Sequence, residues 1–541
     1  MRPFLLCLVF FTVAATAFLV PDPVPFSQTI RKATVNVTII HTTDVHGWLN
    51  GHPHDEAYNA DFGDFLSLVQ RLEEKFSSNR DELGYLLLLD SGDLIEGTGL
   101  SDATPVHGEY IWPLVKQIPY SALTMGNHEI GVESAVDELQ KNFVPHWNGR
   151  YLTANTKKAD SADFVGSPYF VHDSPDGQLR VLFLGYMFDF THFASNVHVV
   201  EVSDSLEEAY FAEAMAVPDV DLYVVLGHID IVMSETDQIR EAVRAHHATT
   251  PIVFMSGHRH IKSYKQLDPN CVAIESWRYF KALGHLSLQL DTSASPNALN
   301  NRLQAVSHRW VDTSRDNFYE LTGRNESNFL TPDGARLKQA IQDTNSMLGL
   351  DEVLGCSPRT YEPSVPLEWD TSLFTLLLTE MYPTVVYNTQ AKKNKQLAIL
   401  NTSSLRNPLY QGTVDRNDIY TVDPFNNVYG SVDDLSGSMV LQLLDFLNNQ
   451  PRELVQWYSC GHEFAASGLP HFVFSPETVI EENTTYDIVC TSYDCITFTR
   501  ALYDLTGVDY PRPTYPTQYT STEALAAFMS QEHPCPAEPS Q

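Results

Sequence analysis

Five apolar runs in the first half of the chain end in the same kind of polar residue. The clearest is Leu86–Leu89, which is followed by Asp90, Ser91, Gly92 and Asp93. Four leucines in a row are typical of a strand buried on both faces of a parallel sheet. The runs at 35–41, 122–125, 222–226 and 252–255 likewise give way to Asp, Asn or His beside a Gly. Because the carboxyl ends of parallel strands form the usual ligand crevice, we expect these polar side chains to gather there.

The polar residues at the five strand ends suit a metal site. They are Asp44, His46, Asp93, Asn127, His228, His258 and His260. Imidazole, carboxylate and amide oxygen suit zinc first, with manganese or iron as alternatives, and the set contains no thiolate. Seven ligands exceed the needs of one tetrahedral ion but suit two divalent metal ions that share a carboxylate. Any one of these residues could be an ordinary turn residue, whereas their recurrence at five strand ends favours the metal site.

In chain order, these blocks resemble a known family. The segments Asp44–His46, Gly92–Asp93, Gly126–Glu129, Gly227–His228 and Gly257–His260 are similar to the five blocks of calcineurin-like metallophosphoesterases. The resemblance spans roughly residues 35–290 and implies an αββα sandwich. It also implies a ligand set for each ion and a catalytic residue, His128, that stabilises the transferring phosphoryl group. The first ion would be held by Asp44, His46, Asp93 and His260, and the second by Asp93, Asn127, His228 and His258.

The second half of the chain resembles the substrate-binding α/β domain of secreted 5′-nucleotidases. The matching residues are Asn401, Arg406, Phe425 and Asn427, with Tyr493 aligned more loosely. The resemblance implies that Asn401 and Arg406 hold the phosphate and ribose region, that Phe425 and Tyr493 stack on the base, and that Asn427 assists. Arginine grips phosphate in a bidentate manner, and a stacked ring contributes about 1–3 kcal/mol per base. Core packing is the alternative role of Phe425 and Tyr493.

Three positions depart from the family pattern. Gly131 stands where the family pairs an Asp with its catalytic His, so another acid would have to orient His128. Thr402 and Ser403 replace two glycines of the phosphate loop, and Asn401 heads a glycosylation sequon. The segment 494–498 replaces a Gly-rich stretch whose Asp contacts the ribose. The metal centre is therefore predicted to be complete and nucleoside recognition to be altered. The motif at 59–64 is similar to a fungal secreted or vacuolar branch of the family.

The 541 residues suggest two domains, because single cores stop growing near about 250–300 residues. We predict a signal peptide at 1–17, a metallophosphoesterase domain at 34–310, a linker with a helix at 311–355 and a substrate-binding domain at 356–541. The polar stretch 295–330 is expected to be part of the linker. Thr331 and Pro332 predict the start of the connecting helix, which would end near Gly349.

A secretory origin agrees with the cysteines and the sequons. Six cysteines remain after the signal is removed, which favours disulfides, with Cys490–Cys495 as a candidate local pair and no other connectivity assigned. Sequons lie at Asn36, Asn325, Asn401 and Asn483. The predicted location is the secretory pathway, outside the cell or in the vacuolar lumen, without a membrane span.

The charge narrows the class of partner. A formal net charge of −34 argues against binding a nucleic-acid polymer, which needs phosphate neutralisation, but metal ions can still attract a small phosphate ester. The resemblance implies hydrolysis of nucleoside 5′-monophosphates by in-line attack of hydroxide held by two metals. Two alternatives remain open, namely a phosphodiesterase or phosphatase for other substrates, and a secreted binding protein without activity. The sequence leaves the oligomeric state open.

Overall fold

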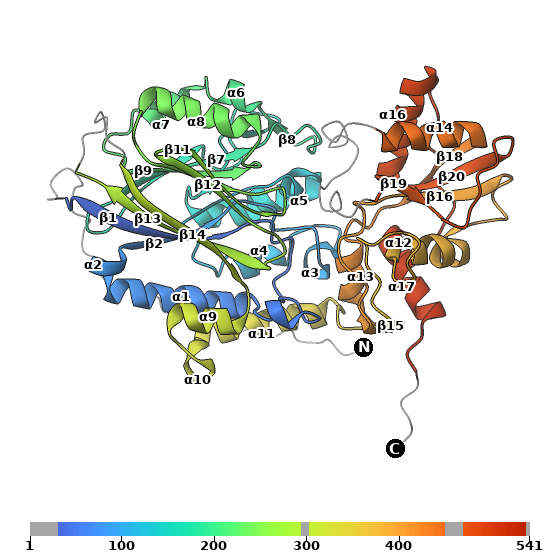
Figure 1. Ribbon diagram of the computed structural model, residues 1–541, viewed down its shortest axis with the longest axis horizontal. Helices are drawn as coiled ribbons and strands as arrows, with labels where there is room; N and C mark the ends of the chain where they lie inside the picture. The colour runs from blue at the N-terminus through green and yellow to red at the C-terminus, as the bar shows by residue number, and fades with distance from the viewer. Residues whose placement is uncertain (1–30, 294–301, 450–468, 537–541) are drawn as a thin grey trace, which may run out of the picture.

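The computed structural model describes residues 31–293, 302–449 and 469–536. The predicted signal peptide at 1–17 and Cys460 lie outside the described residues. The chain forms a larger lobe from the blue, green and yellow segments and a smaller lobe from the orange and red segments (Figure 1). The mixed α/β fold with two parts agrees with the prediction, while the precise domain limits remain predictions.

The first sheet of the large lobe carries three of the five predicted strand ends. Its six strands run in the order β14-β13-β1-β2-β3-β4. The strands β1 to β4 are mutually parallel, and β13 and β14 extend the sheet in antiparallel pairing. Their bounds are β1 Thr34–Thr42, β2 Tyr85–Asp90, β3 Ala122–Thr124, β4 Tyr151–Leu152, β13 Ala282–Asp291 and β14 Leu303–Asp312.

The second sheet carries the other two strand ends. Its order is β11-β12-β10-β9-β7-β6, with four parallel strands between two antiparallel edges. The bounds are β6 Tyr169–Asp173, β7 Arg180–Met187, β9 Leu222–His228, β10 Ile252–Ser256, β11 Lys262–Asp268 and β12 Cys271–Ser276. A short ribbon joins β5 Thr156–Lys158 to β8 Val197–Val199.

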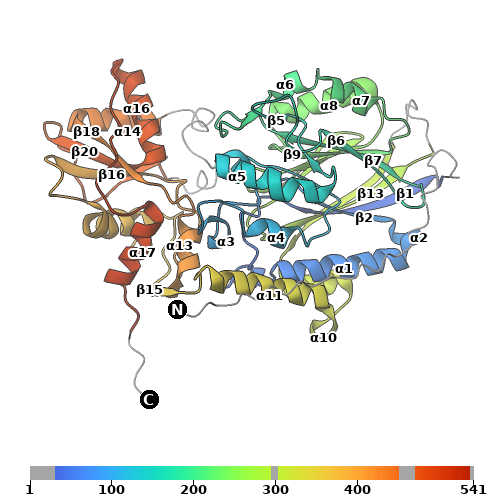
Figure 2. The same ribbon diagram turned by 180° about the vertical axis from the view of Figure 1, so that it is seen from behind.

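Helices cover the outer face of each sheet, which gives the predicted αββα sandwich (Figures 1 and 2). One apolar cluster lies between the sheets, where Ile39 and Leu87 meet Phe183 and Val224. The first sheet packs on α1 Phe62–Ser78, and the second on α7 Ala209–Met215 and α8 Ser234–His246. Shorter helices are α2 Arg80–Leu83, α3 Gly99–Asp102, α4 Ile111–Val115, α5 Glu133–Glu138 and α6 Val202–Ser205. Single turns are η2 Glu56–Tyr58, η3 His128–Ile130, η4 Leu139–Phe143 and η5 Val144–Trp147.

The stretch 295–330 was predicted to be part of a linker, and its described part corrects that expectation. Residues 303–312 form β14 at the edge of the first sheet, followed by α9 Arg315–Thr322 and α10 Glu326–Phe329. An edge strand with one open face accepts polar residues, which explains the misleading composition. The connecting helix is confirmed as α11 Pro332–Met347, and Thr331 Oγ1 caps it by accepting the Gly334 N–H at 3.1 Å. The helix packs along α1.

The small lobe is built on a four-stranded sheet in the order β18-β20-β16-β19. The strands are β16 Lys395–Asn401, β18 Tyr429–Ser436, β19 Phe472–Phe474 and β20 Thr485–Thr491. A separate hairpin pairs β15 Val353–Ser357 with β17 Gly412–Asp415. The helices are α12 Leu373–Leu376, η6 Leu377–Val386, α13 Arg416–Val422, α14 Gly437–Asn448, α16 Ser492–Thr506 and α17 Ser521–Glu532.

Two disulfides fasten the small lobe. The predicted local pair Cys490–Cys495 is confirmed, and Cys356 is joined to Cys535 across 179 residues. Cys271 carries a free thiol that is buried in the large lobe. In the described parts of the chain, no helix is long and apolar enough to cross a membrane.

The two lobes meet where α13 lies against α3 (Figure 2). Asn417 Oδ1 accepts the Gly99 N–H at 3.0 Å. Nearby, His54 Nε2 lies 2.9 Å from Asp418 Oδ1, and the His54 ring stacks on Tyr410 at 4.8 Å. The hydrogen bond to Asp418 raises the pKa of His54.

This contact predicts a pH-dependent contribution to stability. Because folding raises the pKa of His54, its protonated form stabilises the folded protein. This contribution is fully present below the unfolded pKa of about 6.5 and is lost as pH rises through the folded pKa. His54→Gln should therefore lower the thermal midpoint more at pH 5.5 than at pH 9, as measured by differential scanning fluorimetry. The exposed His246→Gln serves as the control. An equal difference at both pH values would contradict the assignment.

Candidate metal centre and active site

The carboxyl ends of β1, β2, β9 and β10 bring six of the seven predicted ligands together, and the loop after β3 carries the seventh, Asn127. Two groups of His and Asp have ligand atoms within 4.8 Å of one another. The first contains Asp44, His46, Asp93 and His260, and the second contains Asp93, His228 and His258. Asp93 belongs to both groups, as a carboxylate shared by two ions would.

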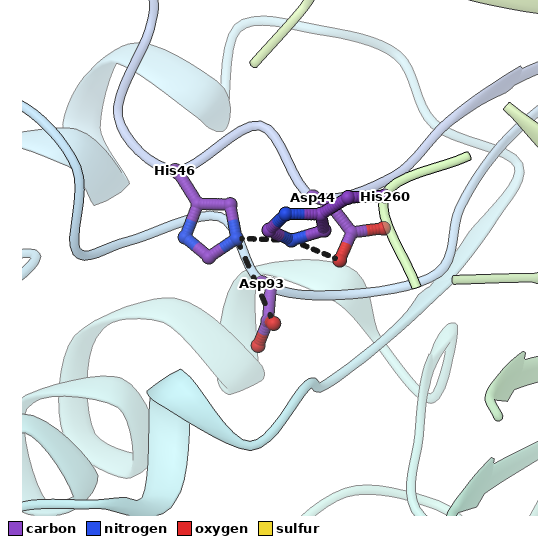
Figure 3. Close-up of side chains that lie close together, drawn as sticks. All are labelled: Asp44, His46, Asp93 and His260. Carbon is purple, nitrogen blue, oxygen red and sulfur yellow. Dashed lines mark hydrogen bonds and ion pairs between the residues drawn. The ribbon is translucent and has the colours of Figure 1, made fainter. Parts of the chain in front are cut away.

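The first group is compact and buried (Figure 3). His260 Nε2 lies 3.2 Å from Asp44 Oδ1 and 3.1 Å from His46 Nε2. His46 Nε2 lies 3.8 Å from Asp93 Oδ2. The loops after β1 and β2 of the first sheet and the loop after β10 of the second sheet thus direct nitrogen and oxygen atoms at a common point.

The second group is completed by an amide. His228 Nε2 lies 2.9 Å from Asp93 Oδ2. Asn127 Oδ1 is buried and has no hydrogen-bond partner among the residues that the structure describes. An unpaired buried carbonyl oxygen is costly, and the neighbouring residue His128 donates its backbone N–H to Asp93 Oδ1 at 3.0 Å, so Asn127 fits a cation ligand at this place. The donor set of imidazole, carboxylate and amide therefore suits two divalent ions.

The backbone fixes which nitrogen of two imidazoles faces the centre. His46 Nδ1 donates to the carbonyl of Glu96 at 2.8 Å, and His228 Nδ1 donates to the carbonyl of Ser91 at 2.8 Å. Because a carbonyl can only accept, Nδ1 carries a proton in both rings, and Nε2 is the nitrogen that points toward the centre. Such outer contacts orient metal-binding histidines in proteins.

The ligand loops hold an unusual backbone conformation. Five of the predicted ligands have positive φ, namely Asp44 (51°), His46 (50°), Asp93 (55°), His258 (88°) and His260 (60°). The left-handed region is uncommon for residues other than glycine and costs about 1–3 kcal/mol at each position. Such conformations cluster at functional sites, because the surrounding fold must impose them.

A close approach of two loops explains one of the predicted glycines. A Cβ on Gly126 would lie 2.0 Å from Asp93 Oδ1. Any larger residue would therefore displace the shared carboxylate. Glycine, which has no Cβ, permits this close approach.

Burial and neighbouring charges together set the protonation of the residues in the two ligand groups. Burial lowers the pKa of His46 and His258 to about 3, so both are neutral, which is the form that binds metal. Burial would raise the pKa of Asp44, but His260 and His228 outweigh it and hold the pKa at about 2. Burial likewise opposes the charge on His228, but Asp93 outweighs it and raises the pKa of His228 to about 10.

Glu129 lies in the Gly126–Glu129 block and supports the site, although the sequence analysis assigns it no role. It is 1% exposed, and its carboxylate accepts the backbone N–H groups of Gly126, Asp93 and Leu94 at 2.6, 2.9 and 2.7 Å. These donors belong to the loops that carry Asn127 and Asp93. Glu129 thus ties the two loops together beneath the metal ligands.

His128 lies beside this centre with its two nitrogens facing different ways. Nε2 is 3.9 Å from Asp93 Oδ2, and Nδ1 donates to Glu96 Oε2. Burial lowers the pKa of His128, but Asp93 and Glu96 outweigh it and raise the pKa to about 9. Position 131 carries no acid, and Glu96 from the loop after β2 is the carboxylate that contacts this imidazole.

Of the predicted substrate residues of the small lobe, Arg406 and Phe425 are in contact with each other. The Arg406 guanidinium lies over the Phe425 ring at 5.0 Å, and its charge lowers the pKa of His128. Asn427 and Tyr493 are half-buried, with Tyr493 in the first turn of α16. The charge of Arg406 thus acts on His128 from the small lobe.

Asn401 is turned into the small lobe. It is 4% exposed, and its Oδ1 accepts the Ser403 N–H at 3.0 Å. Its amide also hydrogen-bonds Asp494, which is 1% exposed. A glycan on Asn401 is incompatible with this conformation.

Comparison with known proteins agrees with the geometry. Residues 37–262 match the sequence model of the calcineurin-like phosphoesterases, and residues 361–491 match that of the NAD nucleotidase C-terminal domain. An uncharacterized protein of Schizosaccharomyces pombe is 32% identical over 441 residues, which cover 76% of this chain and 72% of that protein. The chain belongs to the calcineurin-like phosphoesterase family, in its two-domain 5′-nucleotidase form. It is therefore a hydrolase of phosphoric esters.

Further relatives of this phosphoesterase support the same placement. A secreted protein of Arthroderma benhamiae is 30% identical over 77% of this chain and 68% of its own length. The crystal structure of a 5′-nucleotidase from Candida albicans superposes with a TM-score of 0.81 at 25% identity, covering 92% of this chain and 98% of that one. The predicted fold and the fungal kinship are confirmed.

Proposed function

We propose that this phosphoesterase is a two-metal phosphomonoesterase that acts on nucleoside 5′-monophosphates. The observation that carries the proposal is the pair of ligand groups that share Asp93. The similarity to a 5′-nucleotidase along 92% of the chain supports the substrate class. A small phosphate ester is the expected partner, since the strongly acidic chain disfavours nucleic-acid polymers.

Each ion has a proposed ligand set. Asp44, His46, Asp93 and His260 would hold one, and Asp93, Asn127, His228 and His258 would hold the other. When bound, such ions stabilise charge on a phosphoryl group and lower the pKa of coordinated water toward about 7. Zinc is the proposed metal, with manganese or iron as alternatives, because nitrogen and oxygen ligands suit all three.

The chain's own groups are proposed to position and stabilise the phosphoryl group. Nε2 of His128 faces the Asp93 side of the site and can donate a hydrogen bond to a phosphoryl oxygen or to the leaving oxygen. Arg406 adds a positive charge from the small lobe, and its guanidinium can grip phosphate in a bidentate manner. The proposed substrate set is completed by Phe425, Asn427 and Tyr493, whereas Asn401 faces Ser403 in this conformation and does not belong to it.

The test compares substrates with and without a chelator. Purified protein is assayed for phosphate release from AMP, 3′-AMP, a cyclic nucleotide and p-nitrophenyl phosphate. Chelator-sensitive activity with kcat/KM for AMP at least about tenfold above that for 3′-AMP is expected, because a pocket that binds the nucleoside discriminates between the isomers. Chelator-resistant hydrolysis, or none in protein that holds two metals per chain, would contradict the proposal.

A second candidate is a phosphatase or phosphodiesterase for substrates other than 5′-nucleotides. The burial of Asn401 and Asp494 favours it, because neither side chain is presented to a ribose in this conformation. In the same assay, chelator-sensitive activity without nucleotide preference would support this second candidate.

We also propose that the protein acts in the secretory pathway, outside the cell or in the vacuole. The secreted relative and the two disulfides support this placement, since disulfides persist in oxidising compartments.

A further inference from the structure

Glu96 lies where it can control the orientation of His128. It sits in the loop between β2 and α3, three residues after the shared ligand Asp93. One oxygen, Oε2, accepts the Nδ1–H of His128, and the other, Oε1, accepts the Nδ1–H of His107 at 3.0 Å. The Glu96 side chain is 15% exposed. Both carboxylate oxygens are therefore committed to imidazoles in a largely water-excluded place.

The backbone of Glu96 is held as firmly as its side chain. Its N–H donates to Ser101 Oγ at 2.8 Å, and its carbonyl accepts from His46 Nδ1 at 2.8 Å. Its φ is +64°, a conformation that the surrounding fold must impose on a residue with a Cβ. One residue thus links the metal ligand His46, through its backbone, to His128, through its carboxylate.

We propose that Glu96, steadied by His107, is the positioning residue for His128 and takes the place of the acid that Gly131 lacks. This inference rests on the proposed phosphomonoesterase function. With Nδ1 committed to Glu96, the Nε2 of His128 is the atom presented to substrate. A carboxylate on Nδ1 also stabilises the imidazolium form of His128 whenever Nε2 carries a proton for a phosphoryl or leaving oxygen.

Position 131 offers a way to test the replacement within the same chain. Gly131 directly follows η3 His128–Ile130, and residues three apart lie over one another in a 3₁₀ turn. Its φ of −74° is open to any residue, and the nearest atom to an added Cβ is Asn127 O at 3.9 Å. An Asp introduced here would fit and would lie beside His128.

The experiment measures kcat and KM for AMP, with metal content, in Glu96→Ala, Gly131→Asp and the double variant. Glu96→Ala should lower kcat about 10²-fold, the usual size of a general-acid or charge-stabilising contribution. KM should change less than about threefold, because binding of the ground state is not affected. Two metals per chain should remain, because the Glu96 carbonyl that holds His46 is unchanged. Gly131→Asp should restore kcat of the Glu96→Ala protein at least about tenfold, which a role in folding alone would not permit.

Provided that the wild-type protein shows chelator-sensitive hydrolysis, three results with the variants would overturn the inference. They are unchanged kcat in Glu96→Ala, loss of metal together with kcat, and lost kcat that Gly131→Asp does not restore. If the alanine variant fails to fold, Glu96→Gln takes its place. Glu96→Gln keeps the side-chain volume and should lower kcat less than Glu96→Ala is expected to. The exposed Glu109→Ala is the matched control. An inactive wild type would instead refute the proposed function itself.

Discussion

Replacing Asp93 with Asn should lower kcat for phosphate release about 10³-fold or more, because this carboxylate belongs to both ligand groups. Its Oδ2 lies 2.9 Å from His228 Nε2, and its Oδ1 accepts the backbone N–H of His128 at 3.0 Å. The amide keeps the shape of the side chain but removes the charge that two cations share. Steady-state kinetics and metal analysis of the purified variant measure the effect.

The same substitution should leave the fold intact. The substituted amide keeps the volume of the side chain and an oxygen that can accept the backbone N–H of His128, and His228 gives up its extra proton when its anionic partner is removed, so no buried charge is left unpaired. Thermal denaturation checks this point, and Asp163→Asn, on an exposed turn, is the control for activity. Full activity in folded Asp93→Asn protein would contradict the shared-carboxylate assignment.

Glu129→Ala should destabilise the large lobe by about 3–5 kcal/mol, because three backbone N–H groups lose a buried carboxylate acceptor. The loops of Asp93 and Asn127 would separate, so bound metal should be lost as well. Urea denaturation followed by tryptophan fluorescence measures the stability, and metal analysis measures occupancy.

Two further variants delimit the Glu129 effect. Glu129→Gln keeps the volume and one acceptor oxygen, so it should cost less than Glu129→Ala. Glu133→Ala alters an exposed acid one turn later and should be neutral within about 0.5 kcal/mol. A loss below about 1 kcal/mol in Glu129→Ala would mean that the loops hold their shape without this carboxylate.

The residues of the candidate metal centre were predictable because their signal is local. An apolar run that ends in Asp, Asn or His beside Gly marks both the strand and the place where it delivers its side chain. The parallel order of β1, β2 and β3 then brings Asp44, Asp93 and Asn127 to one edge. The local pair Cys490–Cys495 could be proposed for the same reason, whereas Cys356 and Cys535 are 179 residues apart.

The residues that orient the ligands depend on contacts between distant segments. Glu96 and His128 belong to different loops, and nothing in the spacing of the sequence joins them. The loss of the acid at Gly131 was visible, but its replacement was not. The sequence predicts a linker over β14 because half of its residues are polar, and five of its ten residues are indeed exposed at the edge of the sheet. The sequence likewise could not show that Asn401 faces Ser403.

A crystal structure of the protein with its metals, in which anomalous scattering locates the ions, would show whether two ions share Asp93. Two peaks roughly 3.5–4 Å apart are expected, both next to the Asp93 carboxylate. One should be ligated by Asp44, His46 and His260, and the other by Asn127, His228 and His258. A single ion, or ions bound elsewhere in protein that hydrolyses AMP, would contradict the two-metal centre.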